Sequence, residues 1–351
     1  MKTLKVLDWP DYRFYSESHP LHRWSKTLRE HDIKVEFYSN HKSAKLAGAD
    51  CLFIHSRYFD KGWQNILKRN SENEAELMNY LFEMKKDAGK IIWYDAADST
   101  GSADFPIIHL VDSFVKKQIH KDLTLYTETS KPLRVWLNDN ASSFTPCPKE
   151  ELKKIKIGWN IGLNDYRYFG YKMSRLSNYL SYNIHSVNYQ GVDKKRILDL
   201  TFRGTVKKDV SNKISDQRIE VIKLINSLNL KVATGAAISK KLYLKELGSS
   251  KISISPFGWG EICYRDFETF ISGAVLIKPW MGHLETYPNI YIPNETYLPV
   301  AWDLQDLPDK LNSITSNYNS YKHIAKYGQE LYRKSINDSE TFVKKLKEIM
   351  D

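Results

Sequence analysis

Short apolar runs alternate with amphipathic segments along the first half of the chain. Runs typical of buried strands lie at 4–7, 35–38, 51–55 and 91–94, and helical patterns lie at 24–29 and 74–86. Strands that alternate with helices across short connections predict a parallel sheet with helices on its faces. A further strand is predicted at 152–159, and the segment 113–120 (SFVKKQIH) predicts a short helix.

The second half repeats this alternation. Strands are predicted at 197–202, 231–234, 274–277 and 297–302, and helices at 218–229, within 236–246, from 306, and over 321–350 with a break near Asn337. A polar, glycine-containing segment near 185–195 predicts a linker. The 351 residues exceed what one hydrophobic core usually serves. We therefore predict an α/β protein with an N-terminal domain over 1–190, a second domain over 191–330 and a C-terminal helix over 331–351.

The most informative stretch is 251–279, KISISPFGWGEICYRDFETFISGAVLIKP. It predicts a strand, a turn broken by Pro256, Gly258 and Gly260, a helix over 262–272, and a second strand. Gly273 ends that helix as a C-terminal glycine does. A helix that begins after a glycine turn presents free N–H groups, which favour an anionic ligand and above all a phosphate.

Charged side chains lie near the start of this helix. Arg265 can form a forked pair with a phosphate. Glu268 follows three residues later on the same helical face, where its carboxylate can accept hydrogen bonds from ribose or sugar hydroxyls. Glu261 and Gly258 complete the candidate set in this segment. The alternative is an ordinary surface pair of Arg265 with Glu268, and the spacing leaves both open.

A second polar cluster, DAADSTGSADF, follows the predicted strand 91–94. Ligands of open α/β sheets bind at the carboxyl ends of strands. A carboxylate there can act as general base for an acceptor hydroxyl, and we place Asp98 ahead of Asp95 in that role. The alternative is that Asp98 caps the next turn or helix.

The segment SPFGWGEICYRDFETFISGAVLIKP resembles the donor-binding segment of GT-B glycosyltransferases, particularly the exostosin-like and CgeB-like bacterial group. The resemblance extends over about 199–279. It implies two Rossmann-like domains facing a cleft, with a nucleotide sugar held by the helix and its preceding loop. Arg265 would then contact phosphate, and Glu268 the ribose or donor sugar. In GT-B proteins the terminal helix crosses back onto the first domain, and the resemblance implies the same here.

The turn FRGT, at 202–205, resembles the first strand and loop of the GT-B second domain. In that fold a glycine, here Gly204, lets the backbone approach the donor phosphates. Arg203 and Lys207 would add positive charge at the same place. The alternative for Arg203 is a surface arginine that follows a strand.

Net charge and composition limit the classes of cofactor and partner that this chain is expected to bind. The chain carries a net charge of +10 and has three cysteines, without the spacing of a disulfide framework or a zinc site. The predicted GT-B site needs no metal, and no Asp-x-Asp pair is present, so we expect no cofactor besides the donor. Without a zinc-finger or RNP motif, we expect no nucleic-acid partner. We expect a cytoplasmic protein, with peripheral contact to the inner face of the membrane as a further option.

The sequence therefore supports one main hypothesis. A metal-independent glycosyltransferase would move a sugar from a nucleotide sugar to a hydroxyl of a glycan or lipid-linked saccharide, in surface polysaccharide biosynthesis. The alternative is a non-catalytic protein that binds a nucleotide sugar or a nucleic acid.

Overall fold

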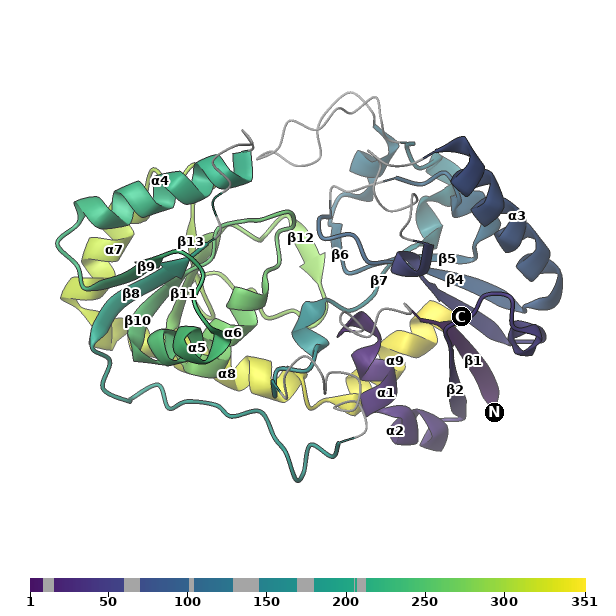
Figure 1. Cartoon of the computed structure of the whole chain (residues 1–351), viewed down its shortest axis with the longest axis horizontal. Helices are drawn as coiled ribbons and strands as arrows, with labels where there is room; N and C mark the ends of the chain where they lie inside the picture. The colour runs from purple at the N-terminus through teal and green to yellow at the C-terminus, as the bar shows by residue number, and fades with distance from the viewer. Residues whose placement is uncertain are drawn as a thin grey trace.

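The computed structural model describes residues 1–8, 16–59, 70–100, 104–128, 145–168, 180–204, 206 and 213–351. Two parallel sheets form separate lobes, as Figure 1 shows. The parallel architecture predicted from the alternation of strands and helices is thereby confirmed.

The first sheet has the order β2-β1-β3-β4-β5-β7. Its strands are β1 (Lys2–Leu7), β2 (Ile33–Tyr38), β3 (Cys51–His55), β4 (Lys90–Asp95), β5 (Ser113–Lys116) and β7 (Ile155–Ile157). All neighbouring strands pair in parallel. The helices that follow its strands include α1 (His19–Arg23), α2 (Ser25–Glu30) and α3 (Ser71–Asp87). Strands β3 and β4 are almost wholly buried because helices cover both faces of the sheet.

The second sheet has the order β13-β11-β10-β8-β9 and is also parallel. Its strands are β8 (Leu198–Arg203), β9 (Val232–Gly235), β10 (Ser250–Ile254), β11 (Val275–Pro279) and β13 (Leu298–Val300). The helices of this lobe are α4 (Lys213–Ser227), α5 (Lys240–Ser249), α6 (Tyr264–Ser272), α7 (Leu307–Ser316) and α8 (Tyr318–Ser335).

Helix α9 (Ser339–Met350) follows α8 after the predicted break and lies against the first sheet. The Ser113 hydroxyl donates to the Ile349 carbonyl at 3.0 Å. The Phe342 ring packs on Trp24 and Trp159, with centroids 4.7 and 5.2 Å away. The last helix therefore completes the core of the first lobe.

The segment 113–120 differs from the prediction. The structure forms two strands there, β5 and β6 (Gln118–His120), where we expected a short helix. Both strands are buried, and Lys116 is buried because its ammonium pairs with Asp95 at 2.5 Å. Ion pairs with Asp95 and Glu17, which come from other segments, bury the two lysines of this stretch. β6 pairs antiparallel with β12 (Leu284–Thr286) of the other lobe, so a two-stranded ladder joins the lobes.

Helix α6 is fixed at both ends. Gly273 adopts φ 67°, the left-handed conformation expected of a C-terminal glycine. At the other end the Asp266 carboxylate accepts the Cys263 N–H at 3.1 Å and the Tyr291 hydroxyl at 2.9 Å. The Lys278 ammonium lies 3.0 Å from Asp266, and both side chains are fully buried. This buried pair sets the position of the helix start relative to β11.

Candidate active site

Two cavities lie at the carboxyl ends of the two sheets. The interdomain cavity has a volume of about 380 Å³ and is lined by both lobes: Glu17, Arg57, Asp98, Lys117, Gln118, Ile161, Arg218, Gly258, Trp259, Gly260, Ile262, Cys263 and Tyr264. The α6 cavity, of about 490 Å³, is lined by Tyr168, Arg218, Lys240, Tyr243, Pro256, Cys263, Tyr264, Arg265 and Glu268. Arg218, Cys263 and Tyr264 line both cavities, so the two adjoin at these residues.

Arg265 lies in the wall of the α6 cavity, one residue into helix α6. Its guanidinium donates to the carbonyl of Arg203 and lies 5.0 Å from the centroid of the Phe202 ring. Its Nε is buried and has no hydrogen-bond partner in the part of the chain that the structure describes. Among the described residues, no carboxylate forms an ion pair with it. The contacts fix the side chain without neutralising its charge, which suits an anionic ligand.

Arg218, on α4, is a second cation that the sequence did not single out. Burial, and then the neighbouring Arg265 guanidinium, lower the pKa of Arg218 from its ordinary value. Both predicted glycines lie beside this side chain. A Cβ on Gly204 would be tight, at 3.1 Å from Phe202 Cζ and 3.3 Å from Arg218 Cδ, whereas one on Gly258 would lie at an ordinary contact distance of 3.6 Å from Arg218 Nη2. Two neighbouring guanidiniums favour a group with two negative charges between them.

Glu268 also lines the α6 cavity and is buried. Its carboxylate accepts the Tyr168 hydroxyl at 2.8 Å and forms an ion pair with the Lys240 ammonium. The carboxylate and its two partners are hydrogen-bonding groups of the kind that hold sugar hydroxyls. Its location near Arg265 agrees with the predicted grouping of these two residues.

Arg203 and Glu261 have other partners than those we expected. The Arg203 guanidinium forms a two-pronged pair with Glu246, at 2.6 and 2.8 Å, and neither cavity is lined by it. Glu261 is fully buried and accepts the Ser99 hydroxyl at 2.9 Å and the Thr100 N–H at 3.0 Å. The Arg203 side chain thus joins β8 to α5, and the Glu261 side chain joins the two lobes by hydrogen bonds. These contacts do not support the donor-binding role that we expected for either side chain. Lys207 lies outside the described residues.

Asp98 lies on the first-lobe wall of the interdomain cavity, with its side chain 55% exposed. Its carboxylate oxygen is 3.3 Å from Arg57 Nη2 and 3.3 Å from Lys117 Nζ. The loop of the second lobe approaches its backbone closely, because a Cβ on Gly260 would lie 1.7 Å from the Asp98 carbonyl oxygen. Only glycine fits at 260 without separating the lobes.

Glu17 is an acid of this wall that sequence reasoning missed. It is buried, with Lys117 Nζ at 3.6 Å, Arg57 Nε at 3.8 Å and His55 Nε2 at 3.8 Å. Burial opposes its ionisation, but His55, Lys117 and Arg57 together hold the pKa of Glu17 well below its usual range. Arg57 follows the predicted strand 51–55, so the rule about carboxyl ends offered a signal for it. Lys117 offered none, because it lies within 113–120, where we predicted a helix, and follows the strand β5 only in the structure.

Neither metal ligation nor membrane crossing has support in the described part of the chain. No cluster of three or more His, Cys, Asp or Glu side chains there is arranged to hold a metal ion. None of the helices there has the length and apolar character required to cross a bilayer.

Comparison with known proteins gives similarity of fold. No family model matches the chain, and no curated protein matches its sequence. The structure is similar to an alpha-glucosyltransferase in complex with UDP, at TM-score 0.52 and 9% identity, over 100% of both chains. A structure of alpha-glucosyltransferase with UDP and a 13-mer DNA containing a HMU base has TM-score 0.51 and 9% identity, over 99% of both chains. The chain thus has the GT-B fold, with two Rossmann-like domains facing a cleft. The narrower exostosin-like and CgeB-like resemblance stays a prediction.

Proposed function

We propose that this protein is a glycosyltransferase that binds a nucleotide-sugar donor in the α6 cavity and an acceptor in the interdomain cavity. The pairing of Arg218 with Arg265 carries this proposal, because two guanidiniums line the wall where α6 begins. A diphosphate placed there would receive hydrogen bonds from both side chains, and their charge would stabilise the leaving nucleotide without a metal ion.

The donor sugar would extend from the diphosphate towards Glu268 and Tyr168. These groups, with Lys240, offer a carboxylate, a hydroxyl and an ammonium within one network. They form directional hydrogen bonds, which would distinguish one arrangement of sugar hydroxyls from another. Gly258 keeps the loop before the helix free of a side chain between the donor and the first lobe.

The acceptor hydroxyl would enter beside Asp98. The two cations Arg57 and Lys117 hold the Asp98 carboxylate in place, and the partial exposure of this side chain leaves an oxygen accessible from the cavity. A carboxylate in this position can take the proton of the attacking hydroxyl. Glu17 is a weaker base because of its low pKa, and its role is to fix Arg57 and Lys117.

The acceptor class has two candidates. One is a hydroxyl of a glycan or lipid-linked saccharide in surface polysaccharide biosynthesis, as the resemblance implies. The other is a hydroxyl on a DNA base, favoured by the similar alpha-glucosyltransferase that was captured with DNA and by the net charge of +10. The second candidate departs from the expectation that no nucleic acid takes part.

Thermal unfolding with UDP and with UDP-glucose tests the donor site. We expect both ligands to raise the Tm of the wild-type protein, since a ligand of the native state stabilises it by mass action. Arg265→Ala should weaken UDP binding by about tenfold or more. Lys223→Ala removes one exposed charge of α4 that lines neither cavity and serves as the matched control. Equal UDP binding by the Arg265→Ala and Lys223→Ala variants would refute the donor assignment.

Transfer of labelled glucose to a panel of glycans and to DNA containing hydroxymethylated bases then separates the acceptor classes. Transfer to one class identifies the acceptor. Donor binding without hydrolysis or transfer would instead support the non-catalytic alternative.

A further inference from the structure

A third and larger cavity lies away from the two described above. Its volume is about 1230 Å³, and none of its lining residues lines the interdomain cavity or the α6 cavity. We call it the hinge cavity, because its walls come from α1 and α2, from the segment 180–189 and from the junction of α8 with α9. That segment and that junction are the two places where the described chain passes between the lobes.

The charged side chains that line the hinge cavity have one sign. Arg23, Lys26 and Arg333 line it, and no Asp or Glu is among the described residues that line it. Most of the other lining groups are hydroxyls, amides and aromatic rings. The Lys26 ammonium is 3.9 Å from Glu30, an exposed ion pair that contributes little and does not remove the positive charge. Such a surface favours anions that also accept hydrogen bonds.

Aromatic rings hold two of the cations in place. The Arg333 guanidinium lies over the Tyr189 ring, 4.3 Å from its centroid. The Arg23 guanidinium lies 3.6 Å from the centroid of Tyr182 and donates to the Ile336 carbonyl. Stacking fixes a guanidinium without neutralising it, so that its remaining N–H groups can bind a ligand.

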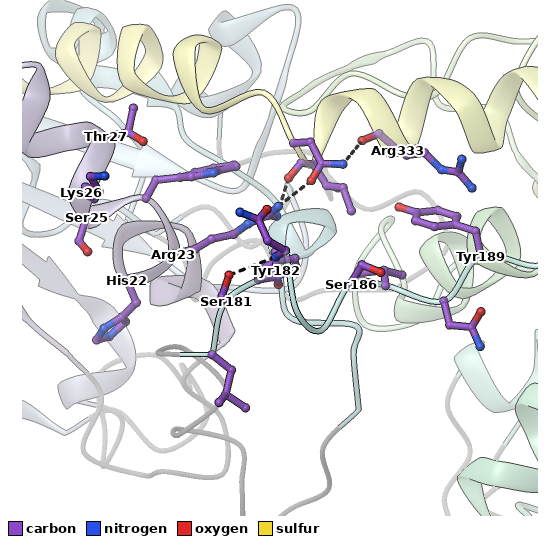
Figure 2. A pocket seen from close by; sticks show the side chains of 17 residues that line it. His22, Arg23, Ser25, Lys26, Thr27, Ser181, Tyr182, Ser186, Tyr189 and Arg333 are labelled. Carbon is purple, nitrogen blue, oxygen red and sulfur yellow. Dashed lines mark hydrogen bonds between the residues drawn. The ribbon is translucent and has the colours of Figure 1, made fainter.

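The cations are distributed across the cavity. Figure 2 shows Ser25 and Lys26 on one side, Arg333 with Tyr189 on the other, and Arg23 with Tyr182 between them. A single small ion could contact only part of this array, whereas a ligand with several charged groups could contact all of it. The volume of about 1230 Å³ leaves room for a ligand with several charged groups.

We propose that the hinge cavity is a second binding site, which takes a small ligand with more than one phosphate group. Such a ligand would contact α1 and α2 of the first lobe and both passages between the lobes at once. It would therefore stabilise one relative position of the lobes, and through it the width of the cleft. This proposal does not depend on the reaction proposed above, because the two sites share no lining residue.

Inorganic tripolyphosphate is a suitable probe, with binding measured by isothermal titration calorimetry. The double variant Lys26→Ala/Arg333→Ala changes two exposed side chains and spares Arg23, whose contact with Ile336 supports the fold. We expect it to bind tripolyphosphate about a hundredfold more weakly, since each of the two lost charged contacts costs about tenfold. Lys334→Ala, on the same turn of α8 but outside the cavity, is the matched control and should bind as the wild type does.

The Arg265→Ala variant separates this site from the donor site. The proposal requires that Arg265→Ala leaves a tripolyphosphate binding event that Lys26→Ala/Arg333→Ala removes. If only Arg265→Ala weakens the binding, or if the double variant binds as tightly as Lys334→Ala, the hinge cavity is not an anion site. If a single-stranded oligonucleotide binds the cavity in preference to tripolyphosphate, the assignment to a small ligand is wrong.

Discussion

The two walls of the cleft use positive charge in different ways. On the first-lobe wall, Arg57 and Lys117 lie within 4 Å of carboxylates from Glu17 and Asp98. On the second-lobe wall, Arg265 is held by a backbone carbonyl and an aromatic ring. Both walls are rich in arginine and lysine in the sequence, and only the structure distinguishes them.

This difference assigns separate tasks to the two walls. Cations that already pair with carboxylates serve to position those carboxylates, so the first wall is suited to proton transfer. A guanidinium held by neutral groups keeps its full positive charge, which can then attract an incoming anion. The second wall is therefore suited to phosphate. Variants that act on one wall should therefore change one step of catalysis and leave the other.

The largest effect is expected on turnover. Asp98→Asn keeps the size of the side chain but removes its basicity, and general-base catalysis typically contributes about 10²–10⁴-fold. We expect kcat to fall by about that factor while UDP affinity stays at the wild-type value, measured by initial rates and by calorimetry. Asp193→Asn, in the exposed linker segment, is the control. If Asp98→Asn weakens UDP binding as strongly as it lowers kcat, the two walls do not have separate tasks.

Loss of the buried pair behind α6 should cost stability. Asp266→Asn leaves the Lys278 ammonium buried without a carboxylate, and breaking such a pair costs about 3–5 kcal/mol. We expect the free energy of unfolding to fall by that amount in urea titrations. Asp309→Asn replaces an exposed acid in the first turn of α7 and should change it far less. Similar losses in the two variants would show that the buried pair does not support the second wall.

The smallest effect is a pH dependence at the ladder between the walls. Burial, followed by His283 and Lys116, lowers the pKa of His120 from 6.5 to about 4. Between these values the unfolded chain binds a proton at His120 that the folded protein does not. The free energy of unfolding should therefore fall as pH falls from 6.5 towards 4, by about 3 kcal/mol at most.

Urea titrations at several pH values check this dependence. His120→Gln should flatten the curve in that range, while His283, whose pKa burial also lowers, remains as an internal reference. A curve with the wild-type slope in His120→Gln would assign the dependence to other groups.

Much of the fold was predictable because periodicity and glycine placement are local signals. The alternation of strands and helices, the end of α6 at Gly273 and the break near Asn337 all follow from residues close together in the sequence. The segment 113–120 was not predictable in this way. Its two lysines are buried by Asp95 and Glu17, which lie far away in the chain.

The candidate site was predicted in part for the same reason. Arg265 and Glu268 belong to one helix, so their common location could be inferred from spacing. Arg218 reaches the cavities from α4, and Glu17 reaches the interdomain cavity from the 3-10 helix Ser16–Ser18 ahead of α1. No local pattern links either residue to α6. The pairing of Arg203 with Glu246 likewise joins β8 to α5, which removes a guanidinium that its position after a strand had suggested for phosphate.

The position of α9 has a consequence for synthesis of the protein on the ribosome. The first lobe begins at residue 2, yet its core needs Phe342 and the backbone of Ile349. Domains usually fold in order as the chain emerges. Here the first lobe cannot complete its core until about 190 residues beyond β7 have been translated. Until then, the face that α9 later covers stays exposed. The nascent first lobe is therefore a natural client for a chaperone, and the second lobe, whose strands and helices are contiguous, is free to fold before it.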